Sequence, residues 1–400
     1  MVSSINGLEK YPKLRFPGFD EPWKVFKAEE LFKNIVDKNH PSETVLTILQ
    51  GKGTLPREQA GRNIHYDDAS LSNYKKVEKG DYIIHLRSFE GGLEMANEDG
   101  IVSPAYTILR CKKPHHGLFY AAYFHTDEFI NHVLSKSVEG IRDGRQISYD
   151  AFKWLGLPYC DISEQGKIAK LFCTLNHRIE KQRQMVDALK KYKRGVMQHI
   201  FHQHDAQDDE EWTCVRLGDI FKKVSRRNSS GLVKNVITNS AEYGLIPQRD
   251  FFDKDIAVDG NTSNYYVIEK GDFVYNPRKS NTAPYGPFNR YTLSERGIIS
   301  PLYTCLVLQA DINPSYLAWY FRSDAWHRYI YDNGSQGVRH DRVSMTDDLL
   351  MGIPVMFPDH AKQQVYADIL DKVEARLQVA QKEYDLFTKA KKGYVQQLFI

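Results

Sequence analysis

The sequence predicts an α+β protein in which two similar globular domains alternate with two long helices. The first observation is an internal repeat: residues 23–201 align with residues 212–399, at an offset that drifts only from 189 to 198. The second is that both copies contain short strand-like runs separated by Gly, Asn, Asp and Pro clusters. The third is that each copy closes with a long segment of helical periodicity. Together they predict approximate two-fold symmetry within one chain.

Matched strings in the same order carry the repeat. KGDYIIHLRS (79–88) aligns with KGDFVYNPRKS (270–280), and VSPAYTIL (102–109) with ISPLYTCL (299–306). Further matches join YAAYFHTD to LAWYFRSD, EGIRDGR (139–145) to QGVRHDR (336–342), and WLGLP (154–158) to LMGIP (350–354). Because these strings recur in order, we interpret the copies as two domains of one fold.

The composition is that of a soluble globular protein. The 400 residues suffice for two or three domains, and 42% are hydrophobic and 26% charged. No apolar run approaches the roughly 18 residues of a membrane span, and the first residues do not resemble a secretory signal. The five cysteines are scattered without a C-x-x-C pair, which favours a reducing cytoplasm over a disulfide framework or a zinc site. The net charge of +3 implies that any nucleic-acid footprint is local.

The first long helix should begin near Asp161–Ser163, where Asp161 and Glu164 fit a capping box. Apolar residues then recur at three/four spacing for about five heptads, and the second helix shows the same pattern. About 40 helical residues would span ~60 Å. We therefore predict that the two helices pair as an antiparallel coiled coil. Its predicted seam comprises Ile168, Leu171, Leu175, Ile179, Met185 and Leu189 in the first helix, and Tyr366, Ile369, Val373, Leu377, Tyr384 and Phe387 in the second.

The predicted boundaries follow from these segments. The polar, acidic stretch HQHDAQDDEE (202–211) is interpreted as a linker between the first helix and the second domain. The predicted division is 1–160 for the first domain, 161–205 for the first helix, 206–357 for the second domain and 358–400 for the second helix.

Two similar heads on one rod suit a partner that offers two contact sites a fixed distance apart, and double-stranded DNA is the leading candidate. The loops differ between the heads, as in RSFEGGLEMANEDG (87–100) and RKSNTAPYGPFNRY (278–291). Similar frameworks with different loops should recognise different base sequences. The expected target is therefore split and asymmetric.

Several segments of the sequence together indicate a known family. They are PKLRFPGFDEPW (12–23), VRLGDIF (215–221), the paired KGD-aromatic strands (79–82 and 270–273) and the paired S-P-x-Y strands. Through these segments, the chain resembles the specificity (S) subunit of type I restriction–modification systems over its whole length. The resemblance implies that each domain is a target-recognition domain for one half-site and that helix length sets the gap between half-sites. It also implies a non-catalytic, cytoplasmic subunit that holds two adenine-methylating modification subunits and recruits restriction (translocase/endonuclease) subunits. The former would bring S-adenosylmethionine and the latter ATP and Mg²⁺, so no cofactor is expected in this chain.

The expected DNA contacts follow the KGD strands and lie at the glycine–arginine turns. Arginine recognises guanine, glutamine recognises adenine, and Arg, Lys and Ser bind phosphates. The alternative for each residue is an ordinary surface ion pair. The candidates are Arg87, Ser88, Arg142, Arg145 and Gln146 in the first domain, and Arg278, Lys279, Ser280, Ser335, Gln336, Arg339, His340 and Arg342 in the second.

Two other classes of function compete with DNA binding. An enzyme is disfavoured because no phosphate-binding loop occurs, and NPRK (276–279) and PDHAK (358–362) lack the remainder of the methyltransferase and nuclease motifs that they partly match. The histidines of HIFHQH (199–204) fit a helix end better than a metal site. A two-headed protein-interaction scaffold without a DNA role stays open, supported by the near-neutral charge. Salt-sensitive duplex binding would exclude it.

Overall fold

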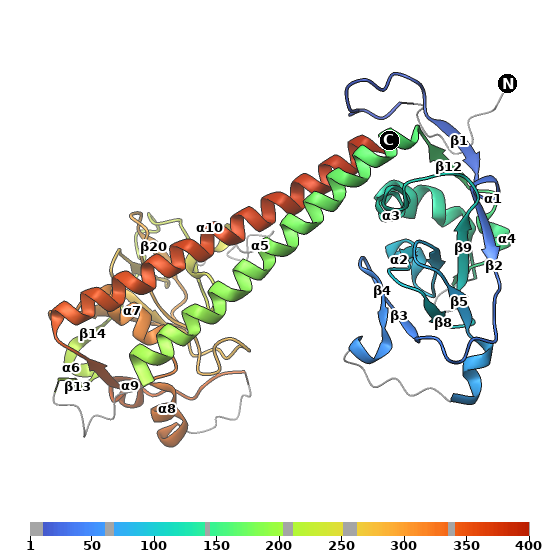
Figure 1. The fold of residues 1–400 in the computed structure, drawn as a ribbon. Coiled ribbons are helices and arrows are strands. Elements are labelled where there is room, and N and C mark those ends of the chain that lie inside the picture. Colours follow the sequence, from blue (N-terminus) through green and yellow to red (C-terminus); the bar gives the residue numbers. More distant parts are fainter. Residues whose placement is uncertain are drawn as a thin grey trace. The chain divides into compact units, whose positions relative to one another are not determined.

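The computed structural model describes residues 11–60, 68–140, 145–202, 211–250, 262–334 and 341–399. Contacts divide the chain into unit 1 (Met1–Gln184 with Gln381–Ile400) and unit 2 (Met185–Ala380). This division cuts across the two long helices, α5 (Ile162–His202) and α10 (His360–Leu398), so each unit contains part of both (Figure 1). The boundaries predicted from the sequence separate the long helices from the domains, which differs from this division into units. They stay a prediction. The mixed α+β class is confirmed.

Unit 1 is built around a four-stranded antiparallel sheet in the order β2-β9-β6-β7. These strands are β2 (Phe32–Ile35), β9 (Thr107–Cys111), β6 (Tyr82–Ile84) and β7 (Glu94–Met95). The strand pairs beside it are β1 (Lys24–Lys27) with β12 (Gly156–Tyr159), β3 (Leu46–Leu49) with β4 (Gly53–Pro56), β5 (Lys75–Val77) with β8 (Gly100–Val102), and β10 (Val138–Glu139) with β11 (Gln146–Ile147). Its short helices include α1 (Ala28–Leu31), α2 (Ser88–Gly91), α3 (Gly117–Tyr123) and α4 (Tyr149–Phe152).

Unit 2 repeats this architecture with a sheet in the order β14-β21-β18-β19. These strands are β14 (Phe221–Val224), β21 (Thr304–Leu308), β18 (Phe273–Tyr275) and β19 (Phe288–Arg290). The strand pairs are β13 (Thr213–Arg216) with β22 (Pro354–Phe357), β15 (Ile237–Ser240) with β16 (Gly244–Pro247), and β17 (Tyr266–Ile268) with β20 (Gly297–Ile299). Its short helices include α6 (Leu217–Ile220), α7 (Pro314–Arg322), α8 (His327–Asn333) and α9 (Asp347–Met351).

Strand register confirms the repeat in the two main sheets. Tyr82 lies opposite Leu109 in unit 1, and the residues aligned with them, Phe273 and Leu306, lie opposite each other in unit 2. Aligned residues therefore occupy the same sheet positions in both units.

One aligned string is shifted in the structure. WLGLP and LMGIP match at an offset of 196, because 350 − 154 = 196. However, the backbone N–H of Ala28 donates to the carbonyl of Leu155, whereas that of Leu217 donates to Ile353, and 353 − 155 = 198. The sequence alignment paired the glycines and prolines. The structure instead places Leu155 and Ile353 at the same position, because the carbonyl of each accepts a hydrogen bond from the residue that begins the short helix α1 or α6.

The KGD motif forms a turn that holds the start of the central strand. Gly80 and Gly271 take φ values of +94° and +102°, a conformation that favours glycine. The Asp81 carboxylate accepts from the backbone N–H of Glu78 at 2.9 Å, and Asp272 closes the second turn in the same way. An arginine from a neighbouring segment pairs with each of these aspartates, Arg110 in unit 1 and Arg226 in unit 2. The motif therefore fixes the direction of the loop that follows β6 or β18.

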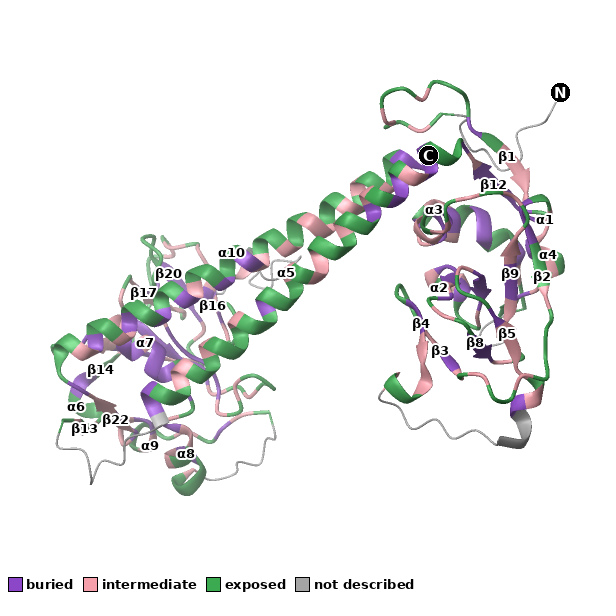
Figure 2. Ribbon diagram, viewed as in Figure 1, coloured by how far each residue is buried: buried purple, intermediate pink, exposed green. Residues whose placement is uncertain are grey.

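Aromatic side chains dominate both cores, and buried residues line the inner faces of the sheets and helices (Figure 2). In unit 1, Phe32 packs edge-on against Tyr82 and Tyr120, with ring centroids 5.6 and 5.2 Å apart. In unit 2, Phe321 stacks on Phe288 at 4.1 Å. Each such ring buries a large apolar surface, so these clusters stabilise the two units.

The end of each long helix is buried in the core of the domain from the other copy. In unit 1, Phe399 after α10 contacts the rings of Phe119 and Tyr123 at 5.4 and 5.5 Å and stacks on Phe172 at 5.7 Å. In unit 2, Phe201 of α5 contacts Tyr316 at 5.6 Å. Each domain core is therefore completed by a helix end that belongs to the opposite half of the sequence.

The start of each long helix is fixed by a buried glutamine. Gln165 donates to the carbonyl of Cys160 at 2.9 Å and accepts from the backbone N–H of His116 at 3.0 Å. Gln363 accepts from the backbone N–H of Asn313 at 2.8 Å and donates to the carbonyl of Pro358 at the same distance. Both glutamines thereby tie the long helix to the segment before α3 or α7.

The predicted capping box is replaced by a longer-range contact. Asp161 does cap the helix, since its Oδ1 accepts from the backbone N–H of Ser163 at 2.8 Å. The buried Glu164 carboxylate instead accepts from Arg15 at 2.8 and 2.9 Å and from the indole N–H of Trp23 at 3.1 Å. The segment 11–23 is thus held onto the helix by a buried, charge-assisted contact.

The long helices pack against each other inside each unit. In unit 1, Arg178 stacks on Phe387 at 4.6 Å and Gln182 donates to Glu383 at 3.0 Å, so these parts run antiparallel. In unit 2, Lys193 donates to Glu374 at 2.9 Å. Supercoiling of the helices stays a prediction.

The predicted seam residues are not equally buried. Met185 and Ile369 are 51% and 39% exposed, and their neighbours Val186 and Leu370 are buried in their place. Val186 lies seven residues after Ile179, so a strict heptad favours it over Met185. Ile168, Val373 and Leu377 are buried, whereas Leu171, Leu175, Ile179, Leu189, Tyr366, Tyr384 and Phe387 are half-buried.

We predict that Phe399→Ala destabilises unit 1 by about 3–5 kcal/mol, because it leaves a cavity among four aromatic rings. Urea titration with limited proteolysis would follow peptides of each unit separately. The control is Leu386→Ala on the same helix, where the side chain is exposed and the change should stay within about 0.5 kcal/mol. Equal effects of the two substitutions would contradict the role of Phe399.

Candidate nucleic-acid interface

In unit 1 the loop after β6 and the glycine–arginine turn lie together. The Arg145 guanidinium stacks on the Phe89 ring at 4.2 Å and lies 3.8 Å from the Glu90 carboxylate. Arg87 and Gln146, which are close in sequence to Phe89 and Arg145, are exposed. We call Arg87, Phe89, Arg145 and Gln146 patch 1. Two clusters that the sequence suggested separately thus form one surface.

Ser88 does not reach that surface. Its side chain is fully buried, and its Oγ accepts a hydrogen bond from the backbone N–H of His85 at 2.8 Å. The expectation that Ser88 contacts DNA does not fit this placement, because the hydroxyl is used to support the turn.

Unit 2 brings the equivalent segments together by backbone pairing. The backbones of Arg278 and Arg342 form an antiparallel β-bridge. The backbone N–H of Lys279 donates to the carbonyl of Asp341, and the N–H of Val343 donates to the carbonyl of Pro277, both at 2.9 Å. The Asp341 carboxylate lies 3.9 Å from Arg278 Nε and 3.7 Å from Arg342 Nε. We call Arg278, Lys279, Ser280 and Arg342 patch 2. Within the described residues, its three cations exceed the one carboxylate that pairs with them, Asp341, by two charges.

The two patches occupy equivalent places in the repeat. Arg87 aligns with Arg278, and Arg145 aligns with Arg342. Their surroundings differ, because α2 packs Phe89 under Arg145 in unit 1, whereas an open hairpin follows β18 in unit 2. The remaining candidates, Arg142, Ser335, Gln336, Arg339 and His340, lie outside the described residues.

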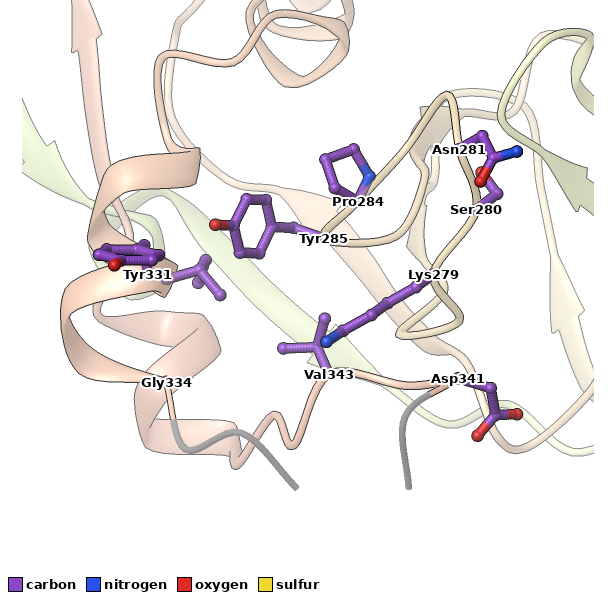
Figure 3. Close-up of a pocket in the computed structure, with 10 residues that line it drawn as sticks. Lys279, Ser280, Asn281, Pro284, Tyr285, Tyr331, Gly334, Asp341 and Val343 are labelled. Atoms are coloured by element: carbon purple, nitrogen blue, oxygen red, sulfur yellow. The ribbon is translucent and has the colours of Figure 1, made fainter. Parts of the chain in front are cut away.

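A cleft of about 450 Å³ adjoins patch 2, between the hairpin after β18 and helix α8 (Figure 3). Its lining includes Lys279, Asn281, Tyr285, Tyr331 and Asp341. Sequence reasoning named Lys279 but missed both tyrosines. Tyr285 lies in the loop already singled out as different between the copies, but Tyr331 is brought there only by the packing of α8.

Behind patch 1, a buried carboxylate organises the sheet edge. Glu94 accepts from the backbone N–H groups of Gly51 and Gly53 at 2.6 and 2.9 Å and pairs with His125 Nε2 at 3.0 Å. Burial acts to lower the pKa of His125, but the hydrogen bond and charge of Glu94 outweigh it. The pKa of His125 is therefore raised above its usual 6.5.

Two properties of the described residues bear on ligands and membranes. No group of three or more His, Cys, Asp or Glu is arranged to hold a metal ion. Within the same part of the chain, every helix is too short or too polar to cross a lipid bilayer.

The chain resembles known proteins in its fold and not in its sequence. No protein-family model matches the sequence, and no curated protein matches it. Among solved structures, the type I restriction–modification S subunit from M. genitalium superposes with a TM-score of 0.58 at 14% identity, over 97% of this chain and 99% of that one. A chain from a study of complex assembly and conformational transition of the type I R-M system gives a TM-score of 0.53 at 15% identity, over 96% and 99%. The HsdS subunit from Thermoanaerobacter tengcongensis matches at 0.47 and 14%, over 98% of each chain.

These likenesses confirm the S-subunit resemblance at the level of the fold. The first two cover nearly the whole of both chains. The repeated domains and both long helices are therefore shared features, whereas identities of 14% and 15% leave loop chemistry to each protein.

We predict that unit 1 loses stability as the pH rises from about 6.5 through the raised pKa of His125. Below pH 6.5 the protonated imidazole keeps its full interaction with Glu94, and deprotonation removes that charge. The midpoint of urea unfolding, followed on unit 1 peptides between pH 6 and 9, measures this dependence. His125→Gln should lose the alkaline part of the slope, and an unchanged slope would refute the assignment.

Proposed function

We propose that this protein is a DNA-binding specificity subunit of a type I restriction–modification complex, without catalysis of its own. The observation that carries the proposal is the equivalent placement of patch 1 and patch 2 on two domains of one fold, with different side chains around them. Two domains with different surfaces suit a bipartite, asymmetric site, with one half-site for each domain. The fold shared with S subunits supports the same assignment.

The patches suit both parts of DNA recognition. Phosphates attract the local positive charge, although the whole chain carries only +3. The ion pairs around Asp341 are exposed and long, at 3.9 and 3.7 Å, so they contribute little to stability and their arginines can exchange partners. Arginine can then recognise guanine bidentately, and Gln146 in patch 1 has the donor and acceptor that adenine requires.

The long helices suit the attachment of partner subunits. Some apolar side chains of α10 are exposed and do not belong to the core of either unit. These are Val365, Ile369 and Val379 in unit 2 and Leu386 and Tyr394 in unit 1. Exposed apolar stripes commonly mark protein contacts. We assign them to two adenine-methylating modification subunits, which would supply S-adenosylmethionine. Restriction subunits with ATP and Mg²⁺ would join that complex.

We predict that each patch controls one half of the target. Co-expression with the modification subunits and mapping of methylated adenines should give one split, asymmetric motif. Arg278→Ala with Arg342→Ala should relax recognition or weaken methylation through one half-site only. Arg87→Ala with Arg145→Ala should affect only the other half-site, because each lost bidentate contact removes about 1–3 kcal/mol of discrimination.

The matched control is Arg328→Ala, which removes an exposed arginine on α8 outside both patches. It should leave the motif unchanged. A soluble complex without any methylated motif would favour a protein-interaction scaffold instead. Changes in both half-sites from one pair of substitutions would contradict the assignment of one half-site to each domain.

We predict that helix length sets the spacer between the half-sites. Seven residues inserted after Gln184 and seven after Ala380, where the contacts divide into units, would preserve heptad register and add about 10 Å of helix. The preferred spacer should lengthen by about three base pairs while both half-sites stay the same. The methylated motif of the lengthened protein measures this, and an unchanged spacer would contradict the mechanism.

A further inference from the structure

We propose that the cleft beside patch 2 binds the sugar–phosphate of a single nucleotide of duplex DNA, with Lys279 contacting the phosphate and Tyr285 and Tyr331 contacting the sugar. The inference rests on the proposed DNA-binding function. It assigns a backbone-anchoring role to this cleft and distinguishes it from the base-recognising arginines next to it.

The hairpin wall of the cleft is held in place by its own contacts. The hydroxyl of Tyr275 donates to the carbonyl of Tyr285 at 2.7 Å, and Ser280 and Ala283 exchange backbone hydrogen bonds at 3.0 and 3.2 Å. Gly286 takes φ +86°, and a Cβ there would lie 2.0 Å from the carbonyl of Asn276. The wall is therefore preformed before any ligand binds.

Helix α8 forms the opposite wall. Ile330 is buried in the core of unit 2 and anchors the helix, whereas the next residue, Tyr331, is 70% exposed. The Tyr285 ring lies 4.9 Å from the ring of His327 at the start of α8, which links the two walls. In Figure 3 the side chains of Tyr285 and Tyr331 approach each other across the cleft. Two rings on one open cleft offer apolar contact for a deoxyribose.

The charge in the cleft is supplied by Lys279. It is half-buried, and within the described chain no carboxylate pairs with its ammonium group. Figure 3 shows its side chain extending toward Val343 at the tyrosine end, with Asp341 on the other side of the lysine backbone. Asp341 is shared by Arg278 and Arg342. The ammonium group is thus a cation available to an anion, and ammonium groups bind phosphate as point charges.

The corresponding loop of unit 1 is built differently. There Phe89 of α2 packs against the core, and Arg145 covers its ring at 4.2 Å. The loop difference between the copies therefore changes the shape of the surface as well as its sequence. The cleft is a feature of unit 2, and it should anchor the DNA backbone beside one half-site only.

The test compares Lys279→Met with Lys270→Met in the full-length chain. Lys270 is an exposed lysine in the turn before β18, whereas Lys279 follows that strand, so both variants remove one charge from unit 2 at opposite ends of β18. Duplex affinity is measured from 0.05 to 0.3 M salt on several unrelated sequences. Lys279→Met should reduce the slope of log K against log salt by about 0.9, which weakens binding about eightfold at 0.1 M salt. The loss should be equal on all sequences.

A second comparison tests the aromatic wall. Tyr331→Ala should weaken binding several-fold, whereas Tyr331→Phe should stay close to the wild type, because the ring and not the hydroxyl contacts the sugar. Since Tyr331 is 70% exposed, neither change should alter folding. Equal losses for both variants, or no loss for Tyr331→Ala, would overturn the sugar contact.

The outcomes separate the two proposals. Salt-dependent duplex binding by the wild type, with equal slopes for the two lysine variants, would overturn the cleft assignment and leave the specificity function in place. A sequence-dependent loss for Lys279→Met would replace the backbone contact with base recognition. Absence of duplex binding would overturn both proposals.

Discussion

The burial of the two helix ends is the constraint on which the rest of the structure depends. Phe399 joins a cluster with Phe119, Tyr123 and Phe172, and Phe201 joins Tyr316 in the other unit. Because each domain is completed by a helix that follows the other domain in sequence, neither core is formed by consecutive residues alone. Folding of each domain is thereby coupled to the long helices, which carry the antiparallel contacts and the exposed apolar stripe of α10.

From these cores, the same local device directs both candidate DNA surfaces. The KGD turn is closed by Asp81 or Asp272, and its glycine supplies the left-handed backbone that the turn requires. A short central strand follows, and the loop after it meets the glycine–arginine turn of the same unit. The loops differ: Phe89 packs beneath patch 1, whereas patch 2 borders a cleft. A conserved framework within one chain can thus present two different surfaces.

Burial separates two kinds of ion pair in this protein. Buried pairs hold the structure together, whereas exposed pairs can exchange their partners. Arg15 and Trp23 share the buried Glu164 carboxylate, so that loss of one partner would leave a buried charge unsatisfied. The contacts of Asp341 with the patch 2 arginines are exposed and close to the 4 Å limit of an ion pair. Near-neutral net charge is therefore compatible with a local positive surface, because acidic residues elsewhere balance it.

The sequence by itself determined the duplication, the α+β class and the two long helices, because repeated strings and three/four spacing are local patterns that survive in one dimension. It also located the loops that form both patches. Tertiary structure alone decided that Ser88 is buried, that Val186 is buried in place of Met185, that Leu155 and Ile353 occupy equivalent positions, and that Tyr331 lines a cleft. Each of these depends on contacts between residues far apart in the chain. Local periodicity does not encode which distant side chain fills a given space, so packing had to decide it.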